Sequence, residues 1–306
     1  MMRTHNQCTL CGGEELVMSS GYPDHNHGRS STYGLSTCKS CNFSFTNPEP
    51  ERKELTQLYF PEESLSIRQA TKLSLAWRIY YFLARRIGVK PPGKLLDVGC
   101  GYGKFMAHVA QSGWEVMGID EFAKPLPRGS LTEARLPIYF KPITDIGLPD
   151  NEFDVITYWW SLEHLPDPLA WLTEAFRLLK PGGRLIATVP NIDSVEARLF
   201  GEYWYHLDVP RHLSHFSPDT LSLACRMAGF KVMSVRHDAL TLGLIGSVEN
   251  WLRKKWFPRL LIKSFWWHVL SIPWDLFVAL LMRNSGLITV YCTKDTEYTD
   301  NRPTYN

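Results

Sequence analysis

The sequence predicts an α/β fold in which a small metal-binding module precedes an open sheet. An apolar run at residues 94–98, typical of a buried strand, ends in a Gly-x-Gly-x-Gly segment at 99–103 and is followed by a helical pattern. A second apolar run at 115–119 ends in Asp120. Two Cys-x-x-Cys motifs lie within residues 8–41. The strand, glycine turn and helix predict the sheet, and the cysteine pairs predict the module.

Composition places the chain among ordinary globular proteins. Its 306 residues are 44% hydrophobic and 21% charged, enough for one large or two modest domains. The net charge of +2, from 33 basic and 31 acidic residues, gives no overall attraction to nucleic acid. The N-terminus has no apolar run of the kind found in signal peptides, and four of the seven cysteines are in the paired motifs. We therefore expect a reducing, cytoplasmic location, with membrane association as a further option.

The first segment, residues 1–60, is expected to be a zinc ribbon and linker. Cys8 with Cys11, and Cys38 with Cys41, form two knuckles that each present two thiolates. Four thiolates complete a tetrahedral shell that suits zinc and leaves no open position for catalysis. We expect a structural Zn²⁺ here, and a redox dithiol is the alternative.

A connecting segment follows at residues 61–92. Its pattern predicts a long helix from about residue 64 to residue 87, with aromatic residues on one side. Such a helix either packs on the sheet edge as core or covers a bound cofactor.

The glycine segment has the chemistry of a cofactor-binding loop. Glycines let a ligand approach the backbone closely, and a carboxylate such as Asp120 at the tip of the second strand accepts hydrogen bonds from ribose hydroxyls. The segment Asp97-Val-Gly-Cys-Gly-Tyr-Gly103 resembles the first motif of the class I S-adenosylmethionine-dependent methyltransferases. The resemblance implies a Rossmann-like seven-stranded methyltransferase sheet over residues 93–296. It implies cofactor contacts from Asp97, Gly99, Cys100, Gly101, Gly103 and Asp120. An ordinary tight turn is the alternative.

The chain after Asp120 matches the family less closely. Prolines interrupt the expected second helix, which leaves a turn or two at 131–136, and a third strand is expected around 138–140. Asp145 falls where the family carries a polar residue near the adenine. A surface acid in a loop is the alternative for this residue.

The fourth strand is expected at residues 152–158. The segment that follows it lies at the carboxyl edge of the sheet and resembles a family motif that ends in Glu-His-x-x-Asp-Pro. The resemblance places Tyr158 and Ser161 beside the methionine part of the cofactor. Glu163 and His164 are expected either to contact the substrate or to cap and orient the next helix. A helix at 169–179 and a fifth strand at 185–189 should follow.

The loop at residues 204–217 concentrates polar groups. It holds three histidines and an arginine, and Ser217 should cap a helix that runs to about residue 228. Loops after the fifth strand overhang the cofactor, so these histidines either contact the substrate and move protons or serve a structural role. The three histidines are His206, His212 and His215.

The same loop resembles that of the zinc-ribbon sugar C-methyltransferases, which carry Tyr-x-Glu-His-x-x-Tyr-Phe-Ser before the corresponding helix. Here the segment is Val209-Pro-Arg-His-Leu-Ser-His-Phe-Ser217. The resemblance makes His212 the first candidate for the catalytic base, with His215 as the second. Arg211 replaces the family's Glu and suits a substrate phosphate or carboxylate, as in a nucleotide-linked sugar.

Two last strands are expected at residues 230–235 and 287–292, separated by an insertion at 241–286. The insertion holds five of the eleven tryptophans, interleaved with basic residues. Peripheral membrane contact through residues 250–275 is one interpretation; the other is a helical hairpin packed over the substrate site or in a dimer interface. Residues 297–306 form a polar tail.

These patterns predict methyl transfer from S-adenosylmethionine to a small or carrier-linked acceptor. A nucleotide- or lipid-linked sugar is the expected substrate. One alternative is a ribosomal RNA base methyltransferase, since some pair a Cys₄ ribbon with this fold, although the near-neutral charge argues against nucleic acid. The other is a non-catalytic adaptor that binds the cofactor. The oligomeric state is left open.

Overall fold

The computed structural model describes most of the chain. The described residues are 2–22, 24–25, 33–59, 90–123, 136–238, 243–255, 271 and 273–295. Three expectations fall outside them: the connecting helix at 64–87, the tail at 297–306 and all but the last residue of the weak helix at 131–136. Most of a fourth, the membrane contact or helical hairpin through residues 250–275, also lies outside them, at 256–270 and 272.

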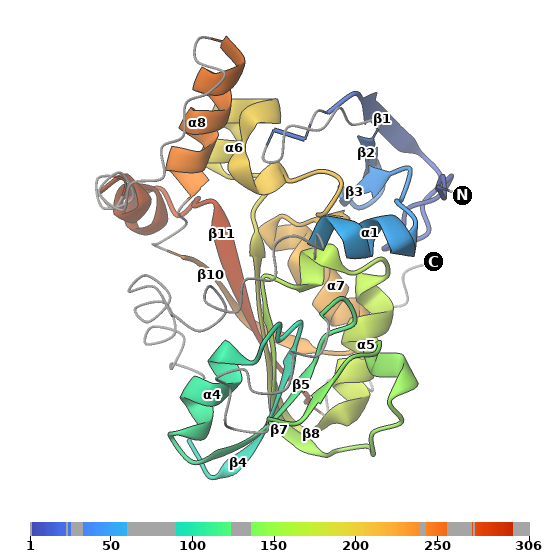
Figure 1. Cartoon of the computed structure of the whole chain (residues 1–306), viewed down its shortest axis with the longest axis vertical. Coiled ribbons are helices and arrows are strands. Elements are labelled where there is room, and N and C mark those ends of the chain that lie inside the picture. Colours follow the sequence, from blue (N-terminus) through green and yellow to red (C-terminus); the bar gives the residue numbers. More distant parts are fainter. Residues whose placement is uncertain are drawn as a thin grey trace.

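A seven-stranded sheet forms the centre of the molecule (Figure 1). Its spatial order is β10-β11-β8-β7-β4-β5-β6, and β11 runs antiparallel to both of its neighbours while the other pairs are parallel. The strands are β4 (Gly93–Val98), β5 (Trp114–Ile119), β6 (Ile138–Tyr139), β7 (Phe153–Trp159), β8 (Leu179–Pro190), β10 (Lys231–His237) and β11 (Leu287–Thr293). The predicted Rossmann-like seven-stranded α/β sheet is confirmed.

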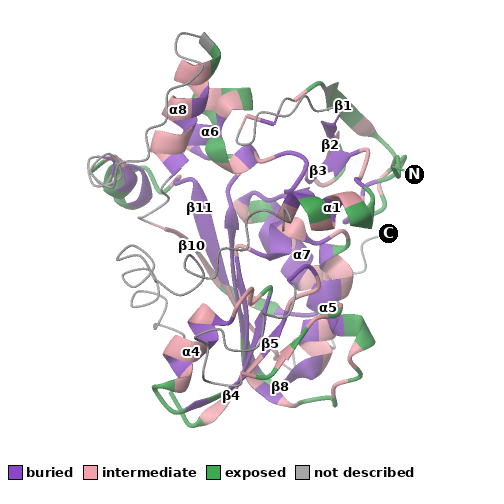
Figure 2. Cartoon of the chain, viewed as in Figure 1, coloured by how far each residue is buried: buried purple, intermediate pink, exposed green. Residues whose placement is uncertain are grey.

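Helices cover both faces of this sheet, which explains why its central strands are apolar on both sides (Figure 2). Neighbouring strand residues face opposite layers: Leu95 packs with α4, and Leu96 packs in the cluster that includes α5 and α7. The side chain of Ser217 caps α7 as expected, and Asp167 caps α5 in place of Glu163 or His164. The helices are α4 (Lys104–Ala110), α5 (Pro168–Leu178) and α7 (Pro218–Met227).

A second, four-stranded sheet joins the N-terminal module to the main domain. Its order is β1 (Leu16–Ser20), β2 (Gly34–Cys38), β3 (Ser44–Asn47) and β9 (Ser214–His215). Strand β9 comes from the loop after β8, where the polar residues of the candidate site lie. The N-terminal module therefore borders that loop directly, and helix α1 (Arg52–Tyr59) follows it. The division of the chain at residue 60 stays a prediction.

Short helices complete the described part. Helix α8 (Gly243–Lys255) packs against α6 (Val195–Phe200), and a π-helix at Phe277–Leu281 leads towards β11. Single 3₁₀ turns lie at Ile143–Asp145, Leu162–His164, Gly201–Tyr203 and Tyr205–Leu207. Among the described helices, none combines the length and the apolar character needed to cross a bilayer.

Candidate active site

The loop between β4 and α4 turns through left-handed backbone conformations. Gly99, Gly101 and Gly103 have φ angles of +74°, +53° and +73°. A β-carbon at Gly99 would lie 2.2 Å from that of Ser161, so a larger residue does not fit there. A β-carbon at Gly101 would meet no atom within 4 Å. The loop thus combines close packing on one side with open space on the other.

Asp120 follows β5, and its carboxylate faces this loop. Oδ2 accepts the Gly101 N–H at 2.7 Å, and Oδ1 accepts the N–H groups of Phe122 and Ala123 at 3.0 and 2.8 Å. An ionised carboxylate has about four acceptor positions, so these bonds orient it and leave capacity for a ribose hydroxyl. The open side of Gly101 and the fixed Asp120 therefore fit the nucleoside of S-adenosylmethionine.

Asp97 lies beneath the loop and supports it. The Thr157 hydroxyl donates to its Oδ1 at 2.8 Å. The pKa of Asp97 is raised to about 7, mainly by burial; the Thr157 bond opposes the rise and the charge of Asp120 adds to it. The neighbouring Cys100 thiol packs against Gly118, and burial raises its pKa, so the thiol stays protonated.

The other residues expected at the cofactor have different surroundings. The Ser161 hydroxyl donates to the Val98 carbonyl at 2.6 Å, which holds this side chain against the glycine loop. Tyr158 is fully buried and its hydroxyl donates to the carbonyl of Trp171 in α5. Its side chain therefore lies in the core on the α5 side of the sheet, because β7 alternates its faces. Asp145 is exposed on its 3₁₀ turn.

Two histidines lie side by side at the carboxyl edge of the sheet. The ring centroids of His164 and His212 are 4.7 Å apart. His212 Nδ1 lies 2.8 Å from the carbonyl oxygen of His206, and His164 Nδ1 lies 2.6 Å from the Tyr59 hydroxyl. A carbonyl oxygen only accepts, so His212 Nδ1 carries the proton and Nε2 has the free lone pair.

Burial controls the protonation of this cluster. It lowers the pKa of His164 and lowers the pKa of His212 well below 6.5, where the charge of His164 adds to the effect. Asp208 opposes this shift, because its Oδ2 lies 3.8 Å from His212 Nε2. Burial also raises the pKa of Glu163 to about 8. At neutral pH the histidines are therefore neutral and Glu163 is largely protonated.

The cluster also has a donor set of the kind that divalent metals use. An oxygen of Glu163 and one ring nitrogen each of His164 and His212 lie within 4.8 Å of one another. Proton transfer and metal binding are thus both chemically open to these groups.

Arg211 and His215 differ from expectation. Arg211 is 5% exposed and donates to both Asp208 (Nε–Oδ2 2.9 Å) and Asp24 (Nη2–Oδ1 3.2 Å). Two carboxylates thus neutralise its guanidinium, which leaves no free charge for a substrate phosphate. His215 Nε2 lies 3.2 Å from the Thr46 hydroxyl of β3, so this ring faces the N-terminal module.

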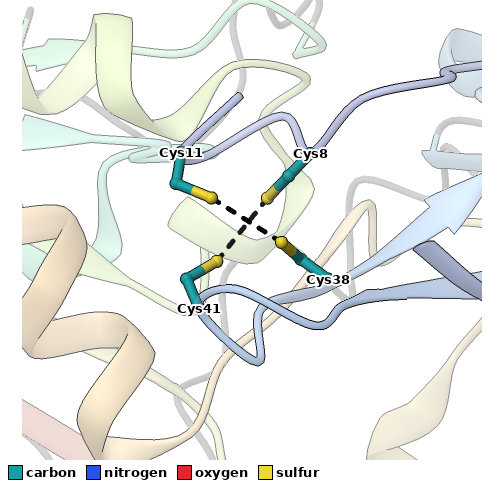
Figure 3. A group of neighbouring side chains, drawn as sticks. All are labelled: Cys8, Cys11, Cys38 and Cys41. Carbon is teal, nitrogen blue, oxygen red and sulfur yellow. Dashed lines mark hydrogen bonds between the residues drawn. The ribbon is translucent and has the colours of Figure 1, made fainter. Parts of the chain in front are cut away.

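The four cysteines of the N-terminal module converge (Figure 3). The sulfur atoms of Cys8 and Cys41 are 3.7 Å apart, and those of Cys11 and Cys38 are 3.6 Å apart. A tetrahedron with Zn–S bonds of about 2.3 Å has sulfur–sulfur edges of about 3.8 Å. The four thiols therefore fit a zinc ion with a closed shell.

Comparison with known proteins agrees with this geometry. The model of a family described as a methyltransferase domain matches residues 72–235, which is 164 of 306 residues. The chain belongs to this methyltransferase family.

The methyltransferase resembles curated relatives over its central half. A ubiquinone biosynthesis O-methyltransferase of Pseudomonas fluorescens is 36% identical over 155 residues, which are 46% of this chain and 66% of the relative. The chain thus spans just under two thirds of that relative's length.

Solved structures show the same fold at low identity. Phosphoethanolamine N-methyltransferase 2 of Haemonchus contortus is 15% identical, with a TM-score of 0.54 over 82% of this chain and 62% of that chain. The 1,6-didemethyltoxoflavin-N1-methyltransferase of Burkholderia thailandensis is 15% identical, with a TM-score of 0.50 over 87% of this chain and 97% of that chain.

Sequence reasoning missed two residues of the methyltransferase site. Tyr59 reaches His164, and Thr46 donates its hydroxyl to the carbonyl of His212 at 2.5 Å. Both come from the N-terminal module and its helix α1, more than 100 residues from their partners. No local pattern marks either residue.

Proposed function

We propose that the methyltransferase transfers the methyl group of S-adenosylmethionine to an oxygen of a small or carrier-linked acceptor. The proposal rests on the position and protonation of His212. Its neutral ring is fixed through Nδ1 and lies at the same edge of the sheet as the glycine loop and Asp120. A neutral imidazole with a free Nε2 is suited to accept a proton. The glycine loop, Asp97, Asp120 and Ser161 are proposed to bind the cofactor, with Asp145 near its adenine.

The proposed mechanism needs positioning and one proton transfer. The bound cofactor supplies an electrophilic methyl group. The loop and Asp120 hold the nucleoside, so the acceptor meets the methyl group in a near-attack geometry. His212 Nε2 takes the proton of the acceptor hydroxyl, and the carboxylate of Asp208 at 3.8 Å stabilises the resulting imidazolium. The proposed roles of Glu163 and His164 are to pack against this base and shape the acceptor site.

A lipid-linked acceptor, such as a lipid-linked sugar, is the substrate class we favour. The names of the curated relatives support an oxygen as the methylated atom. The pairing of Arg211 with Asp24 and Asp208 removes the argument for a sugar nucleotide. The Cys₄ cluster is proposed to hold a structural zinc ion, because its sulfur spacing suits that metal.

The test has two stages. Calorimetry with S-adenosylmethionine and with its demethylated product should give binding heat for both, and Asp120→Ala should weaken each. Isotope transfer from labelled cofactor is then offered in parallel to lipid extract, sugar nucleotides and RNA. We expect label in a lipid fraction. Label in RNA would support the base methyltransferase instead, and binding without transfer to any acceptor would support the adaptor.

A further inference from the structure

One short helix of the methyltransferase presents apolar side chains to solvent. Around the π-helix Phe277–Leu281, five large side chains are between 40% and 75% exposed. They are Leu276, Phe277, Leu280, Leu281 and Met282. We call these five residues the apolar ridge (its exposed side is green in Figure 2).

The polar side chains of the same helix point inward. Asp275 and Ser271 are buried at 0% and 2% exposure, and the Ser271 hydroxyl lies 3.4 Å from Asp275 Oδ2. A surface helix of a globular protein normally shows the reverse pattern, with its charged face in water. The inversion indicates that the outer face meets an apolar phase.

The sequence before and after the ridge is basic. From residue 251 to residue 283 the sequence has six basic residues and a single acidic one, the buried Asp275. The basic residues are Arg253, Lys254, Lys255, Arg259, Lys263 and Arg283. Arg283 is exposed directly after the ridge, and a symmetric contact between two copies would bring the two Arg283 side chains near each other, which disfavours a second copy as the partner. An anionic lipid surface satisfies both the apolar ridge and Arg283.

The ridge is also anchored near the active-site edge. It leads into β11, and the first residue of that strand, Leu287, pairs with Pro190 at the carboxyl end of β8. The carbonyl of Asn284 accepts the N–H of Val195 at the start of α6 at 3.4 Å. The loop that carries His212 follows β8 and α6. A membrane beneath the ridge would thus border the carboxyl edge of the sheet, where the glycine loop and the histidines lie.

We propose that the apolar ridge and Arg283 bind the surface of an anionic phospholipid bilayer. This goes beyond methyl transfer, because the surface is separate from the glycine loop and the histidines. Membrane binding is measured by flotation of the full chain with vesicles of phosphatidylcholine alone and with vesicles that also contain about one third phosphatidylglycerol. We expect binding to the anionic vesicles that weakens as salt is raised.

The variant Leu280→Glu/Leu281→Glu should lower the partition onto anionic vesicles about tenfold or more, because it places charge where the ridge inserts. The matched control is Val17→Glu/Met18→Glu on β1, where two adjacent side chains are 54% and 61% exposed. It should bind vesicles like the unaltered chain. Heat of cofactor binding should be unchanged in both variants, which separates this result from the fate of the proposed catalysis.

Three outcomes would overturn the proposal. The first is no flotation with either vesicle, and the second is an equal loss in the ridge variant and the β1 control. The third is a fall in native mass from dimer to monomer in the ridge variant, which would identify the ridge as a contact between copies.

Discussion

The Tyr59 hydroxyl lies 2.6 Å from Nδ1 of His164, at the junction of two parts of the site. The same hydroxyl donates to the carbonyl of Arg211 at 2.6 Å. The Tyr59 ring stacks on Phe122 at 4.9 Å, two residues after Asp120. One side chain of α1 therefore connects the cofactor side of the site with the histidine side. Burial raises the pKa of Tyr59 well above 10, so its proton stays in place.

Replacing this hydroxyl should disturb catalysis more than binding. Tyr59→Phe removes the phenol bonds to the carbonyl of Arg211 and to Nδ1 of His164, which keep only their own contact at 3.2 Å, so the unfolding free energy should fall by about 1 kcal/mol. We expect kcat to fall while the Kd for S-adenosylmethionine, measured by calorimetry, stays within about twofold.

Tyr33→Phe is the matched control for this variant. The Tyr33 hydroxyl donates to Glu54 Oε2 at 2.7 Å, so the control also loses one phenol bond to α1. It should lose similar stability and retain its turnover. Equal kcat losses in the two variants would show that Tyr59 acts only on stability.

His212→Gln should lower kcat by about 10²–10⁴, the usual contribution of a general base, without loss of cofactor binding. His215→Gln should have a smaller effect, because Nε2 of His215 faces Thr46. Turnover is measured by isotope transfer with the identified acceptor. Near-normal turnover of His212→Gln would exclude His212 as the base.

The pH profile should reflect the lowered pKa of His212. The base must be neutral to act, so the rate should stay level as pH falls from 8 through 6.5 and decline only at more acidic pH. An inflection of the His212-dependent rate at pH 6.5 or above would contradict a buried base.

A chelator tests whether a metal takes part instead. Loss of turnover while the Cys₄ zinc content is unchanged would indicate a metal at Glu163, His164 and His212.

Glu163 should make the chain less stable as pH rises. Its pKa is raised from 4.5 to about 8 by burial, and its Oε2 has no hydrogen-bond partner among the described residues. Between pH 4.5 and pH 8 the unfolded state holds fewer protons than the folded state. The unfolding free energy therefore falls as pH rises, by ~4 kcal/mol over this interval. Glu163→Gln should therefore gain stability over the unaltered chain at pH 8 and little at pH 4.5, as measured by urea unfolding.

Asp238→Asn offers a comparison for that measurement. Burial raises the pKa of Asp238 only to about 6, so its effect on stability should be complete above that pH. Between pH 7 and 8 the stability difference from the unaltered chain should stay constant for Asp238→Asn and widen for Glu163→Gln. A constant difference for both variants would mean that Glu163 is ionised in the folded protein.

Local sequence patterns were sufficient for the sheet and the cofactor loop. Gly99, Gly101 and Asp120 belong to one βαβ unit, so their spacing along the chain already determines their neighbourhood in space. The paired cysteines are equally local within each knuckle. The predicted strands at 138–140, 152–158, 230–235 and 287–292 lie within two residues of β6, β7, β10 and β11. Strand β8 begins six residues before the predicted strand at 185–189.

Long-range pairing was not predictable in the same way. Arg211 looked like a phosphate ligand because its partner Asp24 lies 187 residues away in the chain. The direction of the Tyr158 side chain was not predictable, because the face of a buried strand cannot be assigned when both faces are apolar. The functions of Tyr59 and Thr46 depend on how α1 and β3 dock on the loop after β8, which no local pattern determines.

Loss of the zinc ion that we propose for the Cys₄ cluster should affect the histidine loop. Strand β3 begins three residues after Cys41 and pairs with β9, and the Thr46 hydroxyl of β3 holds the carbonyl of His212 at 2.5 Å. Cys38→Ser should lower zinc content, measured by mass spectrometry, together with thermal stability and turnover. Thr46→Val should retain zinc and still lose turnover, because it removes the bond to His212. Cys292→Ala, which removes a buried thiol outside the cluster, should retain both zinc and turnover. Full turnover of zinc-free Cys38→Ser would show that the module does not position the histidines.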